Sequence, residues 1–198
     1  MKYDCSYTEY QLRKRSWLRQ CVRDVYVNAS LRLLQGRTID FGCGTGELLQ
    51  KLPPGSIGLE INHTTVEYCQ RKGLDVYLYE PQQDQYRLSG FEAGTYESLM
   101  LSHVLEHLEH PEHVVRTLFQ AARRLDIQRI VVIVPGKKGF AFDSTHRTYI
   151  DWTFFTNQNF TEIEGFRTMK HHYFPINIPL LENILTHFEL QVVYDKMN

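Results

Sequence analysis

The stretch Thr38–Leu49, with the sequence TIDFGCGTGELL, decides how this chain folds. Its three glycines, Gly42, Gly44 and Gly46, suit neither a helix interior nor a packed strand, because glycine loses backbone entropy and buries no side chain. They indicate a turn with unusual dihedral angles or a close approach of the backbone to a ligand. With the apolar residues before them and the helix-forming residues 47–52 after them, they predict a strand, a glycine-rich turn and a helix N-terminus.

Such a turn can bind a ligand through its backbone. The N–H groups and the positive end of the helix dipole would face the opening, where they can hold an adenosine-containing ligand and its carboxylate. The spacing Gly42-x-Gly44-x-Gly46, with Asp40 two positions earlier, differs from the G-x-G-x-x-G of dinucleotide-binding proteins. It resembles motif I of the class I S-adenosylmethionine-dependent methyltransferases, D-x-G-x-G-x-G. A glycine-rich turn in another kind of α/β protein is the alternative.

The rest of the chain alternates between strand and helix patterns as far as Gly136. This alternation favours a parallel sheet with right-handed crossovers. We expect strands over 38–41, 56–61, 76–79, 96–102 and 129–135, and helices over 64–72 and 112–125. Residues 129–135 are mostly β-branched, which is typical of a strand that is buried on both faces. Beyond Gly136 we expect a loop over 137–149, a helix over 152–164, and strands over 166–174 and 190–194.

One domain accounts for the whole chain, residues 1–198, since this length supports one sizeable core and is short for two. Within it we expect three parts. Residues 1–35 carry an amphipathic helical pattern and form a candidate lid over the cofactor, with Tyr3, Tyr7, Tyr10 and Trp17 on it. Residues 36–136 form the cofactor-binding core, and residues 137–198 form the acceptor-side loop and the C-terminal strands.

The composition of the chain gives information on its binding partners and its cellular compartment. The formal net charge is −1 and charged residues make up 23% of the chain, so the strongly basic surface of a nucleic-acid-binding protein is missing. The cysteines Cys5, Cys21, Cys43 and Cys69 form no C-x-x-C pair, which favours reduced thiols. We see no signal-peptide pattern and no apolar run long enough for a membrane span, and we therefore expect a cytoplasmic protein.

The resemblance to the class I methyltransferases extends over residues 36–136. Besides Asp40–Gly46 it rests on Leu59-Glu60-Ile61, on the run SHVLEHL at 102–108 and on Val134-Pro135-Gly136, in the family's order. It implies a Rossmann-like, doubly wound α/β sheet of seven strands, six parallel and one antiparallel. It also implies S-adenosylmethionine as cofactor across the carboxyl ends of the first two strands. The cofactor-binding residues that it indicates are Asp40, Gly42, Cys43, Gly44, Gly46, Glu60, Ile61, Ser102 and His103.

The chemistry can be stated for one of these residues, Glu60, and for an adenine contact that the resemblance also implies after the third strand. An acidic residue at the end of the second strand, Glu60, can accept hydrogen bonds from both hydroxyls of a ribose; a solvated strand end is the alternative. Glu80 and Asp84, which follow the third strand pattern, are the candidates for binding the adenine amino group, and the choice between them stays open. His103 is expected to line the cofactor or substrate pocket.

The resemblance does not determine the methyl acceptor. The H-V-L-E-H-L segment occurs in a broad group that includes many small-molecule and sugar methyltransferases. The chain has no Asn/Asp-Pro-Pro-Tyr/Phe segment and no Pro-Cys pair, which amino-directed and C5-pyrimidine nucleic-acid enzymes use. We expect a small-molecule acceptor such as a sugar or metabolite hydroxyl. An RNA or protein methyltransferase, or a cofactor-binding module without catalysis, is the alternative, and the oligomeric state is open.

A hydroxyl acceptor calls for a general base. His146 suits this role, with Asp143 three residues earlier to orient its ring. The competing interpretation makes Asp143, His146 and Arg147 a structural hydrogen-bonded cluster that fixes the loop. A metal site at His103, Glu106 and His107, which His110 and His113 follow, is conceivable from their spacing. We expect no metal, because no carboxylate evidently converges with these histidines.

Overall fold

The computed structural model describes residues 17–197 of the chain, which form one sheet of eight strands. Its order is β3-β2-β1-β4-β5-β8-β7-β6. The first five strands run parallel. They are β1 (Thr38–Phe41), β2 (Ile57–Glu60), β3 (Val76–Leu78), β4 (Ser98–Ser102) and β5 (Arg129–Pro135). The remaining strands, β6 (Glu162–Ile163), β7 (Phe166–Phe174) and β8 (Glu189–Lys196), pair antiparallel with their neighbours.

The expectation of seven strands is therefore wrong by one. In the described residues β1–β5 and β7 run in one direction, as expected for six strands, but both β8 and β6 oppose them. The additional strand β6 lies where the sequence pattern suggested the end of a helix. Glu164 and Gly165 have φ values of +50° and +84° and join Ile163 to Phe166, its partner in β7. Two consecutive residues with positive φ make the tight hairpin that a two-residue connection prefers.

The strand order reverses between β1 and β4, which are neighbours in the sheet although β2 and β3 separate them in the chain. The connections from these two strands leave in opposite directions, and an open α/β sheet has its crevice at such a point, beyond the carboxyl ends of the strands. The topology thus places any ligand site beside Phe41 and Ser102.

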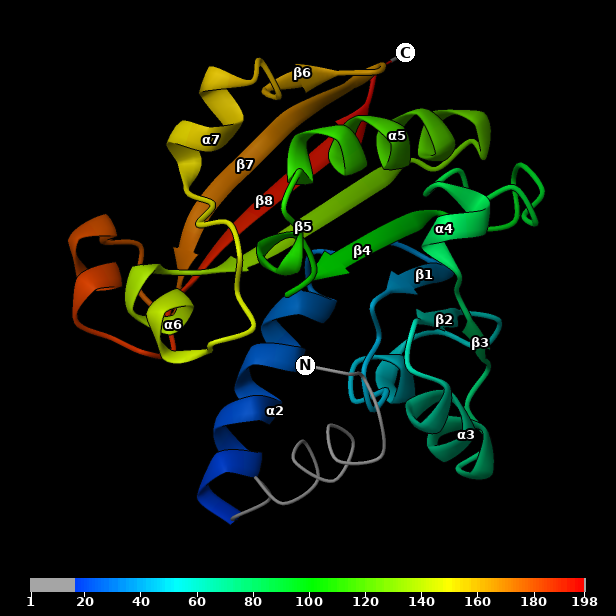
Figure 1. Cartoon of the computed structure of the whole chain (residues 1–198), viewed down its shortest axis with the longest axis horizontal. Coiled ribbons are helices and arrows are strands. Elements are labelled where there is room, and N and C mark those ends of the chain that lie inside the picture. Colours follow the sequence, from blue (N-terminus) through cyan, green and yellow to red (C-terminus); the bar gives the residue numbers. More distant parts are fainter. Residues whose placement is uncertain (1–16, 198) are drawn as a thin grey trace.

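Helices cover both faces of the sheet. Figure 1 shows α5 (Pro111–Arg124) and α7 (Trp152–Asn157) on one side, and α2 (Trp17–Leu31) and α3 (His63–Arg71) on the other. Strand β5 is buried along Ile130–Pro135, as its β-branched sequence predicts. Its residues alternate between two clusters: Ile130, Val132 and Val134 pack in the cluster that contains α5, while Val131 and Ile133 pack in the one that α2 joins. No helix in the described part of the chain is long and apolar enough to cross a membrane.

Three helix expectations need correction. The glycine turn leads to a single 3-10 turn, η1 (Leu49–Lys51), because Leu52 is held extended before Pro53 (ψ 158°). Because no α-helix begins at the glycine turn, a helix dipole does not contribute to ligand binding there. Residues 137–142, expected in a loop, form α6 (Lys137–Phe142). Helix α7 ends at Asn157, where Asn159 has φ +56° and the Phe160 N–H donates to the Phe155 carbonyl, a left-handed helix stop.

Shorter elements complete the chain. They are α4 (Pro81–Asp84), η2 (Leu105–His107) and η3 (Pro179–Asn183). The H-V-L-E-H-L run thus contains the 3-10 turn η2. The thiols of Cys43 and Cys69 are buried and free, as the absence of paired cysteine motifs predicts.

Candidate active site

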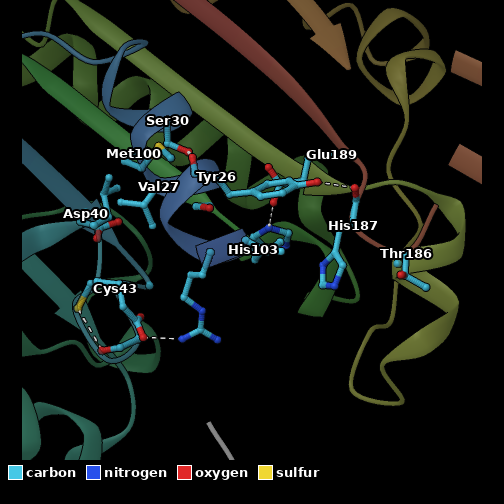
Figure 2. Close-up of a pocket in the computed structure, with 18 of the residues that line it drawn as sticks. Tyr26, Val27, Ser30, Asp40, Cys43, Met100, His103, Thr186, His187 and Glu189 are labelled. Atoms are coloured by element: carbon cyan, nitrogen blue, oxygen red, sulfur yellow. Dashed lines mark hydrogen bonds and ion pairs between the residues drawn. The ribbon is translucent and has the colours of Figure 1, made fainter. Parts of the chain in front are cut away.

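A cavity of about 780 Å³ lies at the carboxyl ends of β1 and β4, where the strand order reverses. This volume is within the range of about 300–1,000 Å³ that is usual for small-molecule sites. Its walls come from α2, from the glycine turn, from the end of β4 and from the segment 186–189 that leads into β8 (Figure 2). Six of the predicted cofactor-binding residues line it: Asp40, Gly42, Cys43, Gly44, Ser102 and His103.

The glycine turn forms one wall of this cavity. Gly42 has φ +76°, and a Cβ atom there would lie 2.5 Å from Cγ2 of Val104, so a side chain at this position would be strained and would clash. Gly46 is also required by packing, since its Cβ would lie 2.6 Å from Cδ1 of Leu74. Gly46 is not among the cavity-lining residues. The first glycine therefore keeps the turn against the H-V-L-E-H-L segment, and the last keeps it against the residues before β3.

Two buried carboxyl groups lie beside the turn, and one of them, Glu60, is hydrogen-bonded to it. Glu60 accepts hydrogen bonds from the backbone N–H groups of Gly44 (3.0 Å) and Asn62 (2.9 Å), and burial raises its pKa. Asp40 is 3% exposed and lines the cavity; burial, followed by the charges of Glu60 and Glu47, raises its pKa to about 7. Neither Glu60 nor Ile61, which is 44% exposed, lines the cavity. The roles predicted for these two residues stay predictions.

Helix α2 covers the cavity and is attached on both sides of it. Arg23 Nη1 lies 2.5 Å from Oε1 of Glu47 beside the glycine turn, and the hydroxyl of Tyr26 donates to the His187 carbonyl on the opposite wall. Burial, with a contribution from Glu189, raises the pKa of Tyr26 to about 12, so its hydroxyl stays protonated. Residues 1–16 of the predicted lid, with Tyr3, Tyr7 and Tyr10, lie outside the described residues. Whether the segment moves as a lid stays a prediction.

His103 stands at the end of β4 with φ +54°, a conformation that turns its ring between two carboxylates. Nδ1 lies 3.1 Å from Oε1 of Glu106, and Nε2 lies 2.9 Å from Oε1 of Glu189 (Figure 2). Burial opposes the charged ring, but the two carboxylates outweigh it and raise the pKa of His103 to about 10. The ring is therefore an imidazolium at neutral pH, which orients Glu189 and cannot itself accept a proton.

The predicted catalytic pair lies elsewhere. His146 is not among the cavity-lining residues; its side chain is 8% exposed, its ring stacks on Phe140, and its Nδ1 lies 2.9 Å from the Phe140 carbonyl. The Asp143 carboxylate does not hold this ring but accepts from the N–H and hydroxyl of Thr145 (2.9 and 2.7 Å). Hydrogen bonds from Thr145 lower the pKa of Asp143 against the opposing effect of burial. These contacts favour the structural interpretation that the sequence left open.

The candidates for the adenine contact also lie off the cavity. Asp84 accepts hydrogen bonds from the Tyr79 hydroxyl (2.6 Å) and from the backbone of Leu88 and Ser89, which orders the residues after β3. Neither Asp84 nor Glu80 lines the cavity. The choice between them remains open.

Several cavity residues were not predicted from the sequence. Arg23 and Tyr26 sit on a helix whose charged residues resemble any solvated face, and Glu189 precedes an ordinary strand pattern. One feature of the sequence could have indicated that Glu189 lies at the cavity. A final strand antiparallel to β5 must begin where the parallel strands end, and Glu189 pairs with Pro135 in that register.

A family model described as a methyltransferase domain matches residues 14–194. Among solved structures, the chain is similar to a SAM-dependent methyltransferase from Archaeoglobus fulgidus, with a TM-score of 0.68, 18% identity and coverage of 96% of this chain and 99% of that one. A search of curated proteins gives no match.

Two further solved structures share this fold. A magnesium protoporphyrin IX methyltransferase from Synechocystis with bound SAH has a TM-score of 0.63 and 15% identity, and the match covers 98% of this chain and 96% of that one. The methyltransferase domain of bacterial CtHen1-C has a TM-score of 0.61 and 18% identity, with 88% of this chain and 96% of that one covered. At these identities the likeness concerns the fold, while the family match covers most of the sequence.

Proposed function

Since this chain belongs to the class I S-adenosylmethionine-dependent methyltransferases, we propose that its cavity holds the cofactor beside a small-molecule acceptor, such as a sugar or metabolite hydroxyl. S-adenosylmethionine is the cofactor of the family, and methyl transfer is the reaction. The proposal concerns the acceptor and the residues that act on it. The observation that carries it is that one cavity joins the glycine turn to the His103–Glu189 pair under α2.

The residues of the cavity fit such a cofactor. The absence of a side chain at position 42 lets the turn pack against Val104, which holds the cavity-lining residues 42–44 in place. Asp40 and Glu47 supply carboxyl groups near this turn, and Met100, Val27 and Leu48 supply apolar surface. We assign cofactor binding to Asp40, the turn residues 42–44 and Ser102. Glu60 supports the turn through Gly44 and retains lone pairs for the hydroxyls of a ribose.

When bound, S-adenosylmethionine supplies a methyl group that its sulfonium already activates. The task of the protein is then mainly to orient the acceptor for in-line displacement and to exclude water. Helix α2 closes the cavity through Arg23 on one side and Tyr26 on the other.

A hydroxyl acceptor also loses a proton, and we assign Glu189 to take it. Its side chain is 13% exposed and lines the cavity, and its Oε1 is already held by His103 at 2.9 Å. The proton would go to Oε2, whose contact in the described residues is a long one to the Gln191 amide at 3.4 Å. A positioned base of this kind adds about 10² to 10⁴-fold to the rate.

Charge and volume support a small acceptor over a polymer. The chain carries a formal net charge of −1, whereas a nucleic-acid acceptor would favour a basic surface around the site. The cavity volume of about 780 Å³ leaves room for a small molecule beside the cofactor. One similar structure is named for a small-molecule substrate, magnesium protoporphyrin IX.

The test has two stages. Isothermal titration with S-adenosylhomocysteine should show one site per chain; absence of binding at millimolar concentration would remove the assigned cofactor site. Methyl-labelled cofactor is then incubated with the enzyme and cell extract, and the products are separated by size before and after nuclease and protease treatment. We expect label in the small-molecule fraction. Label that is released only by nuclease or protease would overturn the small-molecule acceptor.

A further inference from the structure

Glu106 is a buried carboxylate with an unsatisfied oxygen. The residue is 0% exposed, and Oε2 has no hydrogen-bond partner among the described residues, whereas Oε1 lies 3.1 Å from Nδ1 of His103. A buried polar oxygen without a hydrogen-bond partner lowers the stability of the folded protein by about 1–3 kcal/mol, and by more when the group is charged. An oxygen of this kind therefore indicates a missing partner, either a proton donor or a cation.

Two histidines face this carboxylate from different parts of the chain. His107 follows Glu106 in η2, and His146 comes from the loop after α6. One ligand atom from each of Glu106, His107 and His146 lies within 4.8 Å of the others, and Nε2 of His146 is 3.9 Å from Oε1 of Glu106. This last distance is too long for a hydrogen bond. The three side chains converge without satisfying one another.

The surrounding contacts assign the tautomer of each ring. Nδ1 of His146 lies 2.9 Å from the Phe140 carbonyl, which can only accept, so Nδ1 carries the proton. The Thr145 hydroxyl donates its single proton to Asp143 at 2.7 Å, and it must therefore accept from Nδ1 of His107 at 3.2 Å. In the neutral form, each ring therefore carries its proton on Nδ1 and has a free lone pair on Nε2.

We propose that Glu106, His107 and His146 bind a divalent transition-metal ion. Two imidazole nitrogens and one carboxylate are a donor set that Zn²⁺ and related ions take in proteins, whereas Mg²⁺ and Ca²⁺ favour all-oxygen sites. Metal–nitrogen bonds of about 2.0–2.1 Å place neighbouring ligand atoms roughly 3–3.5 Å apart, so the three groups need to close by about 1 Å.

The hydrogen bonds to the other ring nitrogens of the two histidines are those expected around a metal site. A ligating histidine usually donates its other N–H to a carbonyl, a hydroxyl or a carboxylate, which fixes its tautomer and orientation. Here Phe140 supports His146, and the Asp143–Thr145 pair supports His107. The backbone N–H groups of Arg147 and Thr148 donate to the Glu106 carbonyl at 2.7 and 3.1 Å, which holds the loop of His146 against η2. Asp143 and His146 thereby gain a role different from the one expected of a general base.

The site lies beside the methyl-transfer cavity but does not depend on the proposed acceptor. Glu106, His107 and His146 are not among the lining residues, and His103 separates them from the cavity through its contact with Glu106. A binding measurement on the protein without cofactor or acceptor therefore tests the metal site by itself. Failure of that measurement would leave the proposed function untouched, and the reverse also holds.

The experiment uses tag-free full-length protein, stripped with chelator and titrated with Zn²⁺ by calorimetry and with Co²⁺ by visible absorption. We expect one ion per chain and a Co²⁺ spectrum with nitrogen ligands. Glu106→Gln and His146→Ala should each weaken binding by at least about 100-fold, and Thr145→Val by about 10 to 100-fold, the usual effect of an outer-shell change. His113→Ala, at an exposed position of α5, is the matched control and should bind like the wild type.

Folding of each variant is checked by circular dichroism and urea unfolding, which do not depend on the assigned cofactor site. If Glu106→Gln does not fold, Thr145→Val and His146→Ala decide the question. Wild-type protein that takes up no Zn²⁺ at submillimolar concentration would overturn the proposal. So would His146→Ala protein that binds as tightly as wild type, or a loss in His113→Ala equal to that in the ligand variants.

Discussion

Replacement of Asp40 by Asn should make the free protein more stable at pH 8 but not at pH 4. Asp40 is buried at the end of β1, and its pKa rises from 3.8 to about 7 because of burial and the nearby charges of Glu60 and Glu47. Asn has almost the same shape and carries no charge. The variant therefore removes the cost of ionising this position while leaving its packing in place.

The magnitude follows from linkage between proton binding and folding. Between about pH 4 and pH 7 the unfolded chain has lost the Asp40 proton while the folded protein keeps it, so the wild type loses stability as pH rises. Each pH unit in this window costs about 1.4 kcal/mol. The penalty is complete above about pH 7, where it reaches at most about 4 kcal/mol relative to the Asn variant.

Urea unfolding at pH 5, 6, 7 and 8, without cofactor, measures this difference. The free energy of unfolding of Asp40→Asn minus that of wild type should grow by about 1.4 kcal/mol per pH unit up to pH 7 and then level off. Asp75→Asn, at an exposed position before β3, is the control and should show no such trend. A difference that stays constant from pH 5 to pH 8 would refute the buried, protonated Asp40 on which the calculation rests.

Three further changes test other parts of the site. Arg23→Ala breaks a partly exposed ion pair with the turn, worth about 0.2–1 kcal/mol, and should weaken S-adenosylhomocysteine binding by up to about fivefold in calorimetry; unchanged affinity would show that this contact does not close α2. Gly42→Ala should lower stability by about 2–4 kcal/mol in urea unfolding, from positive φ and the clash with Val104. Val104→Ala in the same chain should restore part of this loss, and Gly90→Ala, which meets nothing within 4 Å, should be close to neutral. Glu189→Gln should lower kcat by about 10² to 10⁴-fold with a small change in the KM for the cofactor; full activity would exclude Glu189 as the base.

The parallel half of the fold was predictable because its signals are local. Strands β1 and β5 have the bounds that their sequence patterns indicate, 38–41 and 129–135, and the glycine turn follows β1 as expected. The errors occur where backbone stereochemistry overrides the hydrophobic pattern. Pro53 limits the helix after the turn to η1, and the positive φ of Asn159 and Glu164 ends α7 early and creates β6.

The glycine-turn wall of the cavity was easier to predict than the opposite wall for a related reason. The residues of the glycine turn are contiguous, so their spacing alone places them together. Tyr26, His103 and Glu189 come from three distant segments, and only the antiparallel return of β8 beside β5 brings Glu189 to the carboxyl edge of the sheet. The spacing of residues in a single sequence does not predict a contact between such distant segments.

His146 shows how local sequence criteria can suggest a role without indicating the contacts that the side chain makes in the fold. A histidine three residues after an aspartate, in a loop at the cofactor edge, satisfies every local criterion for a general base. In the structure Asp143 accepts a hydrogen bond from Thr145, and Nε2 of His146 lies 3.9 Å from Oε1 of Glu106, which is 40 positions earlier in the chain. Glu106 belongs to the H-V-L-E-H-L run, but its sequence spacing does not indicate a contact with His146. Its convergence with His146 depends on the hydrogen bonds from Arg147 and Thr148 to the Glu106 carbonyl, and these exist only in the folded protein.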